Sequence, residues 1–330
     1  MKVVVFLRKK RKEANSIEEI FYSLKKYLGD NVGFVELPYG GAGIMSICRN
    51  ILFAYRHRGD VNHISGEIHY IALGLGRKTL LTIHDVQSII KGNKIEQIIK
   101  KWLWFKIPLL IVRKVSVISH FTEKELNTLI PKAKSKISVV YNPATIQYTL
   151  PTSVEQFRNR DYKKMLHIGT KPNKNLEGVL KAAKGLPIEL TIVGKMSESQ
   201  TQLAQDLHIN YKNYYNLPYV EILKLYSDSD VVTFPSFYEG FGMPIIEANA
   251  VGVPIVASDI PVLHEVANDA AYFVDPNSIT SIRKAILSLL ENNALREKLI
   301  GLGKENIKRF APQTIAEQYK SIYNQLDRSV

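Results

Sequence analysis

Short runs of β-branched and apolar residues alternate with stretches of helical periodicity along most of the chain, and this alternation constrains the fold more than any other feature. Strands are expected at 3–7, 33–37, 60–64, 79–83, 115–119, 137–140, 165–169, 188–193, 230–235, 254–257 and 271–274. Helical patterns fill the gaps, for example near 176–184, 198–207, 220–227 and 245–250. Strands that alternate with helices form parallel sheets with helices on their faces. The sequence therefore predicts an α/β protein.

The alternation stops once, after residue 140, and this interruption divides the chain. A length of 330 residues also exceeds what one hydrophobic core usually serves. We expect a first domain at 1–145, a linker at 146–161, a second domain at 162–312 and a closing helix at 313–330. Open parallel sheets bind ligands at the carboxyl ends of their strands, so the chemistry should lie at strand-to-helix junctions.

Cysteine content and hydropathy restrict the compartment. A single cysteine, Cys48, excludes an internal disulfide and a multi-cysteine metal site, and it fits a reducing compartment. The apolar start at 1–7 precedes a basic run at 8–12, which reverses the order of a secretory signal. No stretch approaches the roughly 20 uncharged apolar residues that span a bilayer. We therefore expect a cytoplasmic protein that does not cross membranes.

The positive charge is concentrated in the first half of the chain. Residues 1–150 hold 24 Lys and Arg against 11 Asp and Glu, whereas residues 151–330 hold 20 of each. Residues 94–114 mix lysines with tryptophans and aliphatic residues, a composition that fits either an interfacial helix or a core helix with solvated lysines. The charge asymmetry favours contact of the first domain with an anionic membrane surface on the inner face of the cell membrane.

The strongest candidate site is the junction at residues 235–248, where an expected strand ends, a glycine loop turns and a helix begins. Gly240 and Gly242 let the backbone approach a ligand, and the first amides of the helix can hold a diphosphate. Glu239 and Glu247 flank this turn, and carboxylates accept hydrogen bonds from paired hydroxyls. A ligand with an anionic centre and polyol ends, a nucleotide-sugar, suits this arrangement. An acidic residue favoured by the helix dipole near the start of a helix would explain Glu239 without a ligand, but it would not explain the whole motif at 235–248.

This junction carries a family resemblance. Glu239, seven intervening residues and Glu247 lie within EGFGMPIIEANAVGVPIVAS, which resembles the signature of retaining glycosyltransferases of the GT-B fold, family four (glycosyl transferases group 1). The resemblance continues through SDIP at 258–261 and HIGTKPNKN at 167–175, and covers most of 163–290. It implies two Rossmann-like, doubly wound α/β domains facing a central cleft, with the last helix crossing back onto the first domain.

The resemblance also implies roles at the donor site. Glu247 would bind the ribose hydroxyls, Glu239 would orient the sugar, and Lys174 would neutralise the leaving diphosphate, so that neither a metal ion nor another cofactor is needed. The family's usual arginine is absent here, which leaves Lys171 as a second cation. Isolated lysines in such a loop would more often be solvated. The expected donor-binding residues are Gly169, Thr170, Lys171, Lys174, Glu239, Gly240, Phe241, Gly242, Met243 and Glu247.

The acceptor side is expected in the first domain. His84 and Asp85 end an expected strand, and without context a histidine there would more often be a packed side chain than a catalytic one. The resemblance implies that His84 lines the sugar and acceptor pocket with Asp85 beside it. Gly40 and Gly41 precede an expected helix and would shape the acceptor side, although a flexible turn explains them equally.

We therefore expect a retaining hexosyltransferase that moves a hexose or deoxyhexose from a nucleoside-diphosphate sugar to a saccharide or lipid-linked acceptor in cell-surface polysaccharide synthesis. Glu239, His84 and Lys174 are its expected catalytic residues. The family route is a same-face displacement rather than a covalent intermediate. One alternative is a nucleotide-sugar epimerase or hydrolase. Another is a basic nucleic-acid-binding module, for which no motif is present, so nucleic acid is not an expected partner.

Overall fold

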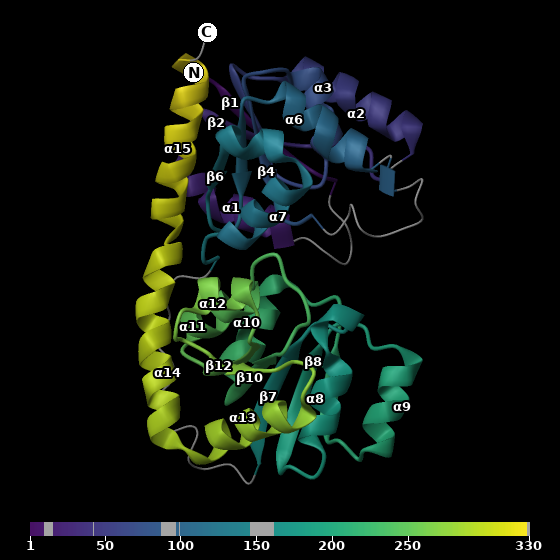
Figure 1. Cartoon of the computed structure of the whole chain (residues 1–330), viewed down its shortest axis with the longest axis vertical. Coiled ribbons are helices and arrows are strands. Elements are labelled where there is room, and N and C mark those ends of the chain that lie inside the picture. Colours follow the sequence, from purple (N-terminus) through teal and green to yellow (C-terminus); the bar gives the residue numbers. More distant parts are fainter. Residues whose placement is uncertain (10–15, 42, 87–96, 99, 146–161, 329–330) are drawn as a thin grey trace. The chain divides into compact units, whose positions relative to one another are not determined.

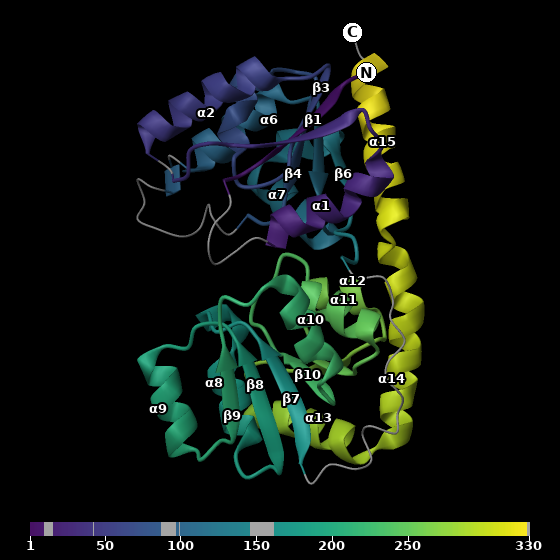
Figure 2. The same cartoon turned by 180° about the vertical axis from the view of Figure 1, so that it is seen from behind.

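The computed structural model describes residues 1–9, 16–41, 43–86, 97–98, 100–145 and 162–328. The chain divides into two units, a first unit of Met1–Thr145 with Ala311–Val330 and a second unit of Ile146–Phe310. The expected linker at 146–161 lies outside the described residues. Figure 1 labels many of the helices and strands of both units, and Figure 2 shows the same cartoon from behind.

The first unit is built on a six-stranded parallel sheet with the order β2-β1-β3-β4-β5-β6. Its strands are β1 (Val3–Leu7), β2 (Val32–Glu36), β3 (Val61–Ile64), β4 (Thr79–Ile83), β5 (Lys114–Val117) and β6 (Ile137–Val139). Its helices are α1 (Ser16–Leu28), α2 (Ile44–His57), α3 (Ala72–Leu75), α6 (Ile107–Ile111), α7 (His120–Leu129) and α15 (Pro312–Arg328), with helical turns η1 (His69–Ile71), η2 (Lys101–Lys106) and η3 (Pro131–Lys136). Since β1 pairs with both β2 and β3, the winding direction reverses at β1.

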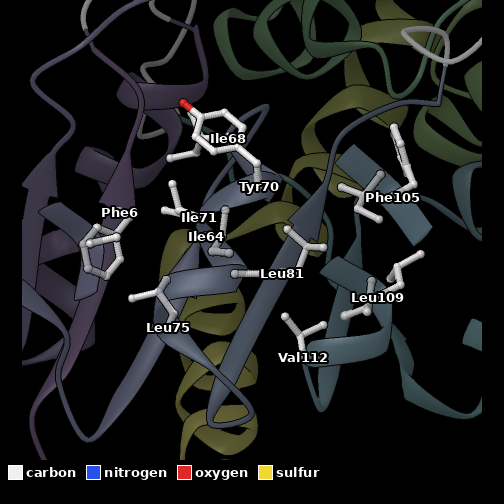
Figure 3. Packing of buried hydrophobic residues seen from close by; sticks show 14 of the residues in the cluster. Phe6, Ile64, Ile68, Tyr70, Ile71, Leu75, Leu81, Phe105, Leu109 and Val112 are labelled. Atoms are coloured by element: carbon white, nitrogen blue, oxygen red, sulfur yellow. The ribbon is translucent and has the colours of Figure 1, made fainter. Parts of the chain in front are cut away.

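Both faces of this sheet are covered, because successive strand residues point to opposite faces and both sets are buried. Val4 and Phe6 of β1 and Ile64 of β3 belong to a core that also contains Leu75 of α3 and Leu109 of α6. Figure 3 shows Phe6, Ile64, Leu75 and Leu109 in this core. The apolar runs that form β1, β3 and β4 are therefore strands that are buried on both sides.

The last helix, α15, packs against α1, β3 and β4 of the first unit. His63 on β3 is fully buried, with Nδ1 2.7 Å from the Tyr323 hydroxyl and Nε2 2.7 Å from Oγ1 of Thr82. Phe21 of α1 lies edge-on to the His63 ring, with ring centroids 5.1 Å apart. Burial lowers the pKa of His63 to about 3, so the ring is neutral near pH 7. Side chains from three elements thus hold α15 in the first unit.

The second unit also has a six-stranded parallel sheet, with the order β12-β11-β10-β7-β8-β9. Its strands are β7 (Lys163–Ile168), β8 (Ile188–Val193), β9 (Tyr211–Tyr214), β10 (Val231–Phe234), β11 (Ile255–Ser258) and β12 (Tyr272–Val274). Its helices are α8 (Leu176–Ala183), α9 (Glu198–Asp206), α10 (Tyr219–Ser227), α11 (Met243–Val251), α12 (Pro261–Ala267), α13 (Ile279–Glu291) and α14 (Asn293–Asn306), with turns η5 (Pro172–Lys174) and η6 (Ile307–Phe310). The winding direction reverses between β7 and β10, which are neighbours.

The predicted fold class, doubly wound α/β, is confirmed in each unit. Three elements of the second unit, β9, α12 and α13, were not predicted from the sequence. β9 is an edge strand in which half-buried Tyr211 and Asn213 alternate with exposed Lys212 and Tyr214, so it has no apolar run to reveal it. α13 does carry a helical stripe of buried residues, which was there to be recognised.

The basic and aromatic segment at 94–114 packs into the core of the first unit on one side and exposes apolar side chains on the other, and its contact with a membrane stays a prediction. Residues 94–96 and 99 lie outside the described residues, and most of the remainder forms η2 and α6. Phe105 and Leu109 are buried in the core of the first unit, whereas Trp102 and Leu110 are exposed. The segment is therefore a core helix with an apolar outer surface.

Candidate active site

The reversal between β7 and β10 marks the place where a sheet of this type binds ligands, because the two following loops leave in opposite directions. The loop after β7 carries residues 169–175, and the loop after β10 carries residues 235–242. These are the two segments that the sequence singled out in the second unit. Topology thus brings together motifs about 65 residues apart in the chain.

Hydrogen bonds fasten these two loops to each other. The Asn173 side chain donates to the Tyr238 carbonyl at 3.2 Å, and the Phe237 amide donates to the Asn173 carbonyl at 2.9 Å. Asn175 is buried in a left-handed conformation with φ 60°, and its Nδ2 donates to the Pro235 carbonyl at 3.1 Å. Asparagine tolerates this conformation better than most residues. The loops therefore form one fixed surface.

Lys174 and Glu239 meet on this surface. Nζ of Lys174 lies 2.6 Å from Oε1 of Glu239, and the two side chains are 21% and 12% exposed. Nζ also lies 4.9 Å from the centroid of the Phe234 ring, a distance at which a cation is attracted by the ring face. Gly169 has φ +96°, and a Cβ there would lie 2.7 Å from Cγ of Lys174. Gly169 therefore leaves room for the lysine stem.

Glu247 lies at the middle of α11, a helix whose residues from Pro244 to Val251 are all buried. Its residue exposure is 7%, and its two oxygens accept hydrogen bonds from Tyr219 at 2.7 Å and Tyr226 at 2.6 Å. Burial raises the pKa of Glu247, while the two tyrosine hydroxyls and the charge of Lys174 act to lower it. The carboxylate is a desolvated acceptor rather than a surface charge.

The amino end of α11 offers backbone donors to an anion. Gly242 precedes the helix with φ +123°, a conformation that residues with a Cβ rarely adopt. Among the described residues, no protein group accepts a hydrogen bond from the amides of Gly242 and Met243. The Phe241 side chain is buried and packs edge-on to Phe310, with centroids 5.9 Å apart, so only its backbone belongs to the site. Gly240 lies in the same turn, beside Glu239.

Thr170 and Lys171, the other expected donor-site residues, lie in the loop after β7. The Thr170 hydroxyl donates to the Lys195 carbonyl at 2.7 Å, and the Thr170 carbonyl accepts from Gln200 at 2.9 Å. These bonds hold the loop against the start of α9. Lys171 is exposed, immediately before η5. In this structure Thr170 shapes the loop, and Lys171 is the more accessible of the two cations.

The first unit contains a cavity of ≈ 380 Å³ at the carboxyl ends of its strands. All four residues expected on the acceptor side, Gly40, Gly41, His84 and Asp85, line it. The other lining residues are Arg8, Lys9, Tyr39, Glu67, Ile68, His69, Tyr70, Lys100 and Trp104. They come from segments that follow β1, β2, β3 and β4, together with the helical segment that contains η2. The structure therefore brings the predicted acceptor residues into one hollow.

His84 is an uncharged hydrogen-bonding group in this cavity. Its Nε2 lies 2.8 Å from the Ser65 carbonyl oxygen. A carbonyl can only accept, so Nε2 carries the proton and Nδ1 of the neutral ring is an acceptor. Burial lowers the pKa of His84, although the Ser65 carbonyl and Asp85 act in the opposite direction. Near neutral pH His84 is therefore suited to accept a hydrogen bond from a hydroxyl.

The aromatic wall of the cavity was not predicted from the sequence. Asn50 of α2 is fully buried, and its Nδ2 donates to the Tyr39 carbonyl at 2.8 Å and to the Tyr70 hydroxyl at 3.0 Å. Tyr70 and Trp104 pack edge to face with centroids 5.3 Å apart, and Trp104 Nε1 donates to the Glu67 carbonyl at 2.8 Å. Fixed aromatic rings beside polar groups are typical of small-molecule sites. Trp104 belongs to the basic and aromatic segment at 94–114, but nothing in the sequence placed it or the tyrosines beside a cavity, so only the tertiary structure reveals this wall.

Arg8 has a different role from the one its basic run suggests. Its Nε donates to Oε1 of Glu18 at 2.6 Å, and both side chains are buried. Its Nη1 lies 3.3 Å from the Glu67 carboxylate at the cavity. Arg8 is therefore a paired cation in the wall, and it contributes less to a diffuse positive surface than its place in the basic run indicates.

Within the described parts of the chain, no three His, Cys, Asp or Glu side chains gather closely enough to hold a metal ion. No helix among the described residues is long and apolar enough to cross a bilayer.

Residues 152–306 match the family model described as Glycosyl transferases group 1. The chain is 33% identical over 178 residues to O-antigen chain mannosyltransferase B of Escherichia coli, covering 49% of this chain and 45% of that protein. It is 27% identical over 221 residues to O-antigen chain mannosyltransferase RfbU of Salmonella typhimurium, covering 64% and 61%. The matched stretch is thus less than two thirds of the length of either relative.

The whole chain also resembles solved structures. It superimposes with a TM-score of 0.74 on Alr3699/HepE of Anabaena, solved in complex with UDP and glucose, covering 98% of this chain and 100% of that one at 15% identity. Identity at this level shows the fold alone, and the fold is GT-B. The sequence comparison therefore relates residues 152–306 to the glycosyl transferases group 1 family, and the structural comparison shows that the chain has the GT-B fold.

Proposed function

We propose that this protein is a retaining glycosyltransferase that moves a hexose or deoxyhexose from a nucleoside-diphosphate sugar to a saccharide or lipid-linked acceptor in cell-surface polysaccharide synthesis. The observation that carries the proposal is the pairing of Lys174 with Glu239 before α11, together with the buried carboxylate of Glu247 within this helix. The mannosyltransferases matched by sequence and the complex of Alr3699/HepE with UDP and glucose support this substrate class.

The donor would bind in three parts. The backbone amides of Gly242 and Met243 would hold the diphosphate at the positive end of the α11 dipole. Glu247 would accept hydrogen bonds from the ribose hydroxyls, and Glu239 from the sugar hydroxyls. Lys174 would share its three N–H donors between Glu239 and the diphosphate, where negative charge increases as the glycosyl bond breaks. A protein cation in this place makes a metal ion unnecessary for charge stabilisation.

The acceptor would bind in the cavity of the first unit. His84 Nδ1 is placed to accept a hydrogen bond from a hydroxyl, and Tyr39 and Trp104 provide apolar ring surface. In a same-face displacement the departing phosphate takes the proton of the attacking hydroxyl, and Glu239 orients the sugar rather than forming a bond to it. The anomeric configuration of the product, measured by NMR, tests retention, and activity that persists in EDTA tests independence from metal.

The donor site is tested first by binding. We expect one of UDP, GDP and ADP, or a sugar derivative of one of them, to raise the melting temperature of the wild-type protein by several degrees at about 100 times Kd. Glu247→Ala should abolish this rise. Glu291→Ala, which removes an exposed carboxylate at the end of α13, is the matched control and should keep it. The absence of any response in the wild type would contradict the proposal.

We also propose that the first unit contacts an anionic membrane surface, with α2 as the main contact. Its outer face exposes Ile44, Met45, Leu52 and Tyr55, with exposed fractions of 82%, 66%, 49% and 51%. The basic residues Arg49, Arg56 and Arg58 lie in or just after the same helix. An apolar face flanked by basic residues is the composition of interfacial helices. Gly40 and Gly41 of the cavity lie just before α2, so this contact would suit a lipid-linked acceptor.

A further inference from the structure

Two tyrosines of α10 converge on the Glu247 carboxylate. Tyr219 and Tyr226 are seven residues apart, close to two helical turns, so they lie on the same face of α10. Tyr219 is hydrogen-bonded to Oε1 of Glu247 at 2.7 Å, and Tyr226 to Oε2 at 2.6 Å. Each carboxylate oxygen therefore has its own phenol partner. Tyrosines that served only to fill space in the core would not need to donate hydrogen bonds to Glu247.

The chemistry of this arrangement leaves acceptor capacity for a ligand. A phenol that donates to a carboxylate favours the ionised form, and such charge-assisted bonds are strong. Each carboxylate oxygen has two lone-pair sites, so one hydrogen bond leaves room for another. The two remaining sites belong to adjacent oxygens of one group. Adjacent acceptors match the two neighbouring hydroxyls of a ribose and mismatch a 2′-deoxyribose, which has only one of them.

We propose that Tyr226 and Tyr219 are positioning residues that hold the Glu247 carboxylate ionised and in one orientation, so that the site selects ribonucleoside diphosphates over their 2′-deoxy analogues. The inference rests on the proposed function, because it takes Glu247 as the ligand of the nucleotide. Tyr226 is fully buried and acts only through Glu247. Tyr219 is half-buried in the first turn of α10. Its hydroxyl donates the second hydrogen bond to the same carboxylate, from a less buried position than Tyr226.

The tyrosines also set the pH range over which Glu247 can act. Burial raises the pKa of Glu247, and three described groups act against it: Tyr226 and Tyr219 from α10, and Lys174 from η5. Removing a phenol hydroxyl therefore raises this pKa further. A protonated carboxyl loses acceptor capacity for the diol, so nucleotide binding is lost as the pH falls through this pKa. In a Tyr226→Phe variant that loss should begin at a higher pH than in the wild type.

The test compares UDP, GDP and ADP with dUDP, dGDP and dADP by isothermal titration calorimetry. We expect wild-type protein to prefer the ribose form of its nucleotide by tenfold or more, as sites built around a buried acceptor reject ligands that leave it unpaired. Tyr226→Phe should weaken ribonucleotide binding about tenfold and 2′-deoxynucleotide binding much less. The acid limb of binding should move to higher pH. Tyr219→Phe should act in the same direction with a smaller effect.

The controls separate positioning from folding. Tyr211→Phe removes a tyrosine hydroxyl at the amino end of β9 and should change neither the selectivity nor the acid limb. If Tyr226→Phe fails to fold, judged by far-UV circular dichroism, Tyr219→Phe carries the test, because this side chain is only half-buried. Two results would overturn the tyrosine assignment alone. One is that the folded variants keep the selectivity and the acid limb of the wild type. The other is that the wild type binds ribonucleoside and 2′-deoxyribonucleoside diphosphates with equal affinity. Failure of wild-type protein to bind any nucleotide would overturn the proposed function as well.

Discussion

Lys174 and Glu239 illustrate how single residues divide the work at the proposed donor site. They pair at 2.6 Å while both are mostly buried, so each charge is compensated by the other. Lysine has three N–H donors, and Glu239 takes one of them. Only the lysine can stabilise charge that appears on a leaving diphosphate, whereas the glutamate can only accept. In this pair, Lys174 would stabilise the charge that develops in the transition state, and Glu239 would bind the hydroxyls of the sugar.

This division predicts a kinetic effect at Lys174. Lys174→Gln keeps a polar side chain of similar length but removes the charge, and kcat for sugar transfer should fall by about 10²–10³-fold, as for other single donors that stabilise developing charge. KM for the donor should change less, because the charge matters most in the transition state. Steady-state transfer assays measure both constants. Lys181→Gln, an exposed lysine of α8, is the control. An unchanged kcat in Lys174→Gln would contradict the assignment.

At the scale of elements, the amino end of α11 depends on a backbone conformation that glycine permits. Gly242 has φ +123°, and a Cβ there would lie 2.8 Å from Cδ2 of Leu263 on α12. Leu263 can shift, but the backbone strain of a side chain at this φ cannot be relieved locally. The turn thus sets the direction of the Gly242 and Met243 amides. A change at Gly242 should affect both stability and anion binding.

Gly242→Ala should therefore lower the free energy of unfolding by about 1–3 kcal/mol and weaken binding of the preferred nucleoside diphosphate. Chemical denaturation and calorimetric titration measure the two effects. Gly301→Ala is the opposite control, because a Cβ at Gly301 in α14 meets nothing within 4 Å and alanine favours helix. It should stabilise the protein by about 0.5–1 kcal/mol and leave nucleotide binding unchanged. Equal effects of the two substitutions would contradict the argument.

At the scale of the whole molecule, charge is distributed unevenly along the chain. The first 150 residues carry the entire positive excess, while residues 151–330 are balanced. Buried pairing of Arg8 removes one cation from the surface of the first unit. The exposed arginines of α2 remain beside its apolar face. Attraction to an anionic surface should therefore be a property of this unit.

Co-sedimentation with lipid vesicles tests this property. Wild-type protein should bind vesicles of phosphatidylcholine with phosphatidylglycerol, bind pure phosphatidylcholine weakly, and dissociate as salt rises, because ions screen surface charge. Substituting Ile44→Ser together with Met45→Ser should reduce the binding several-fold by removing apolar area. Val220→Ser, the control, removes a comparably exposed apolar side chain from the second unit, and this variant should bind the vesicles as the wild type does. Unchanged binding by the α2 variant would exclude this helix as the contact.

The α/β class, most of the strands and the position of the candidate donor-site loop could be predicted from the sequence alone. These features are local: strands buried on both sides read as apolar runs, and residues 235–248 form one continuous junction. Where a local signal is weak, as in the polar edge strand β9, the reading failed.

Which distant side chains meet depends on the three-dimensional fold and could not be predicted from the sequence. The phenols of Tyr219 and Tyr226 on Glu247, the burial of Arg8 against Glu18, and the aromatic wall around Tyr70 each join separate segments of the chain. Periodicity reports whether a residue is buried, but not against what. The order of the strands and the packing of helices on the sheets select the partner, and those depend on the chain as a whole.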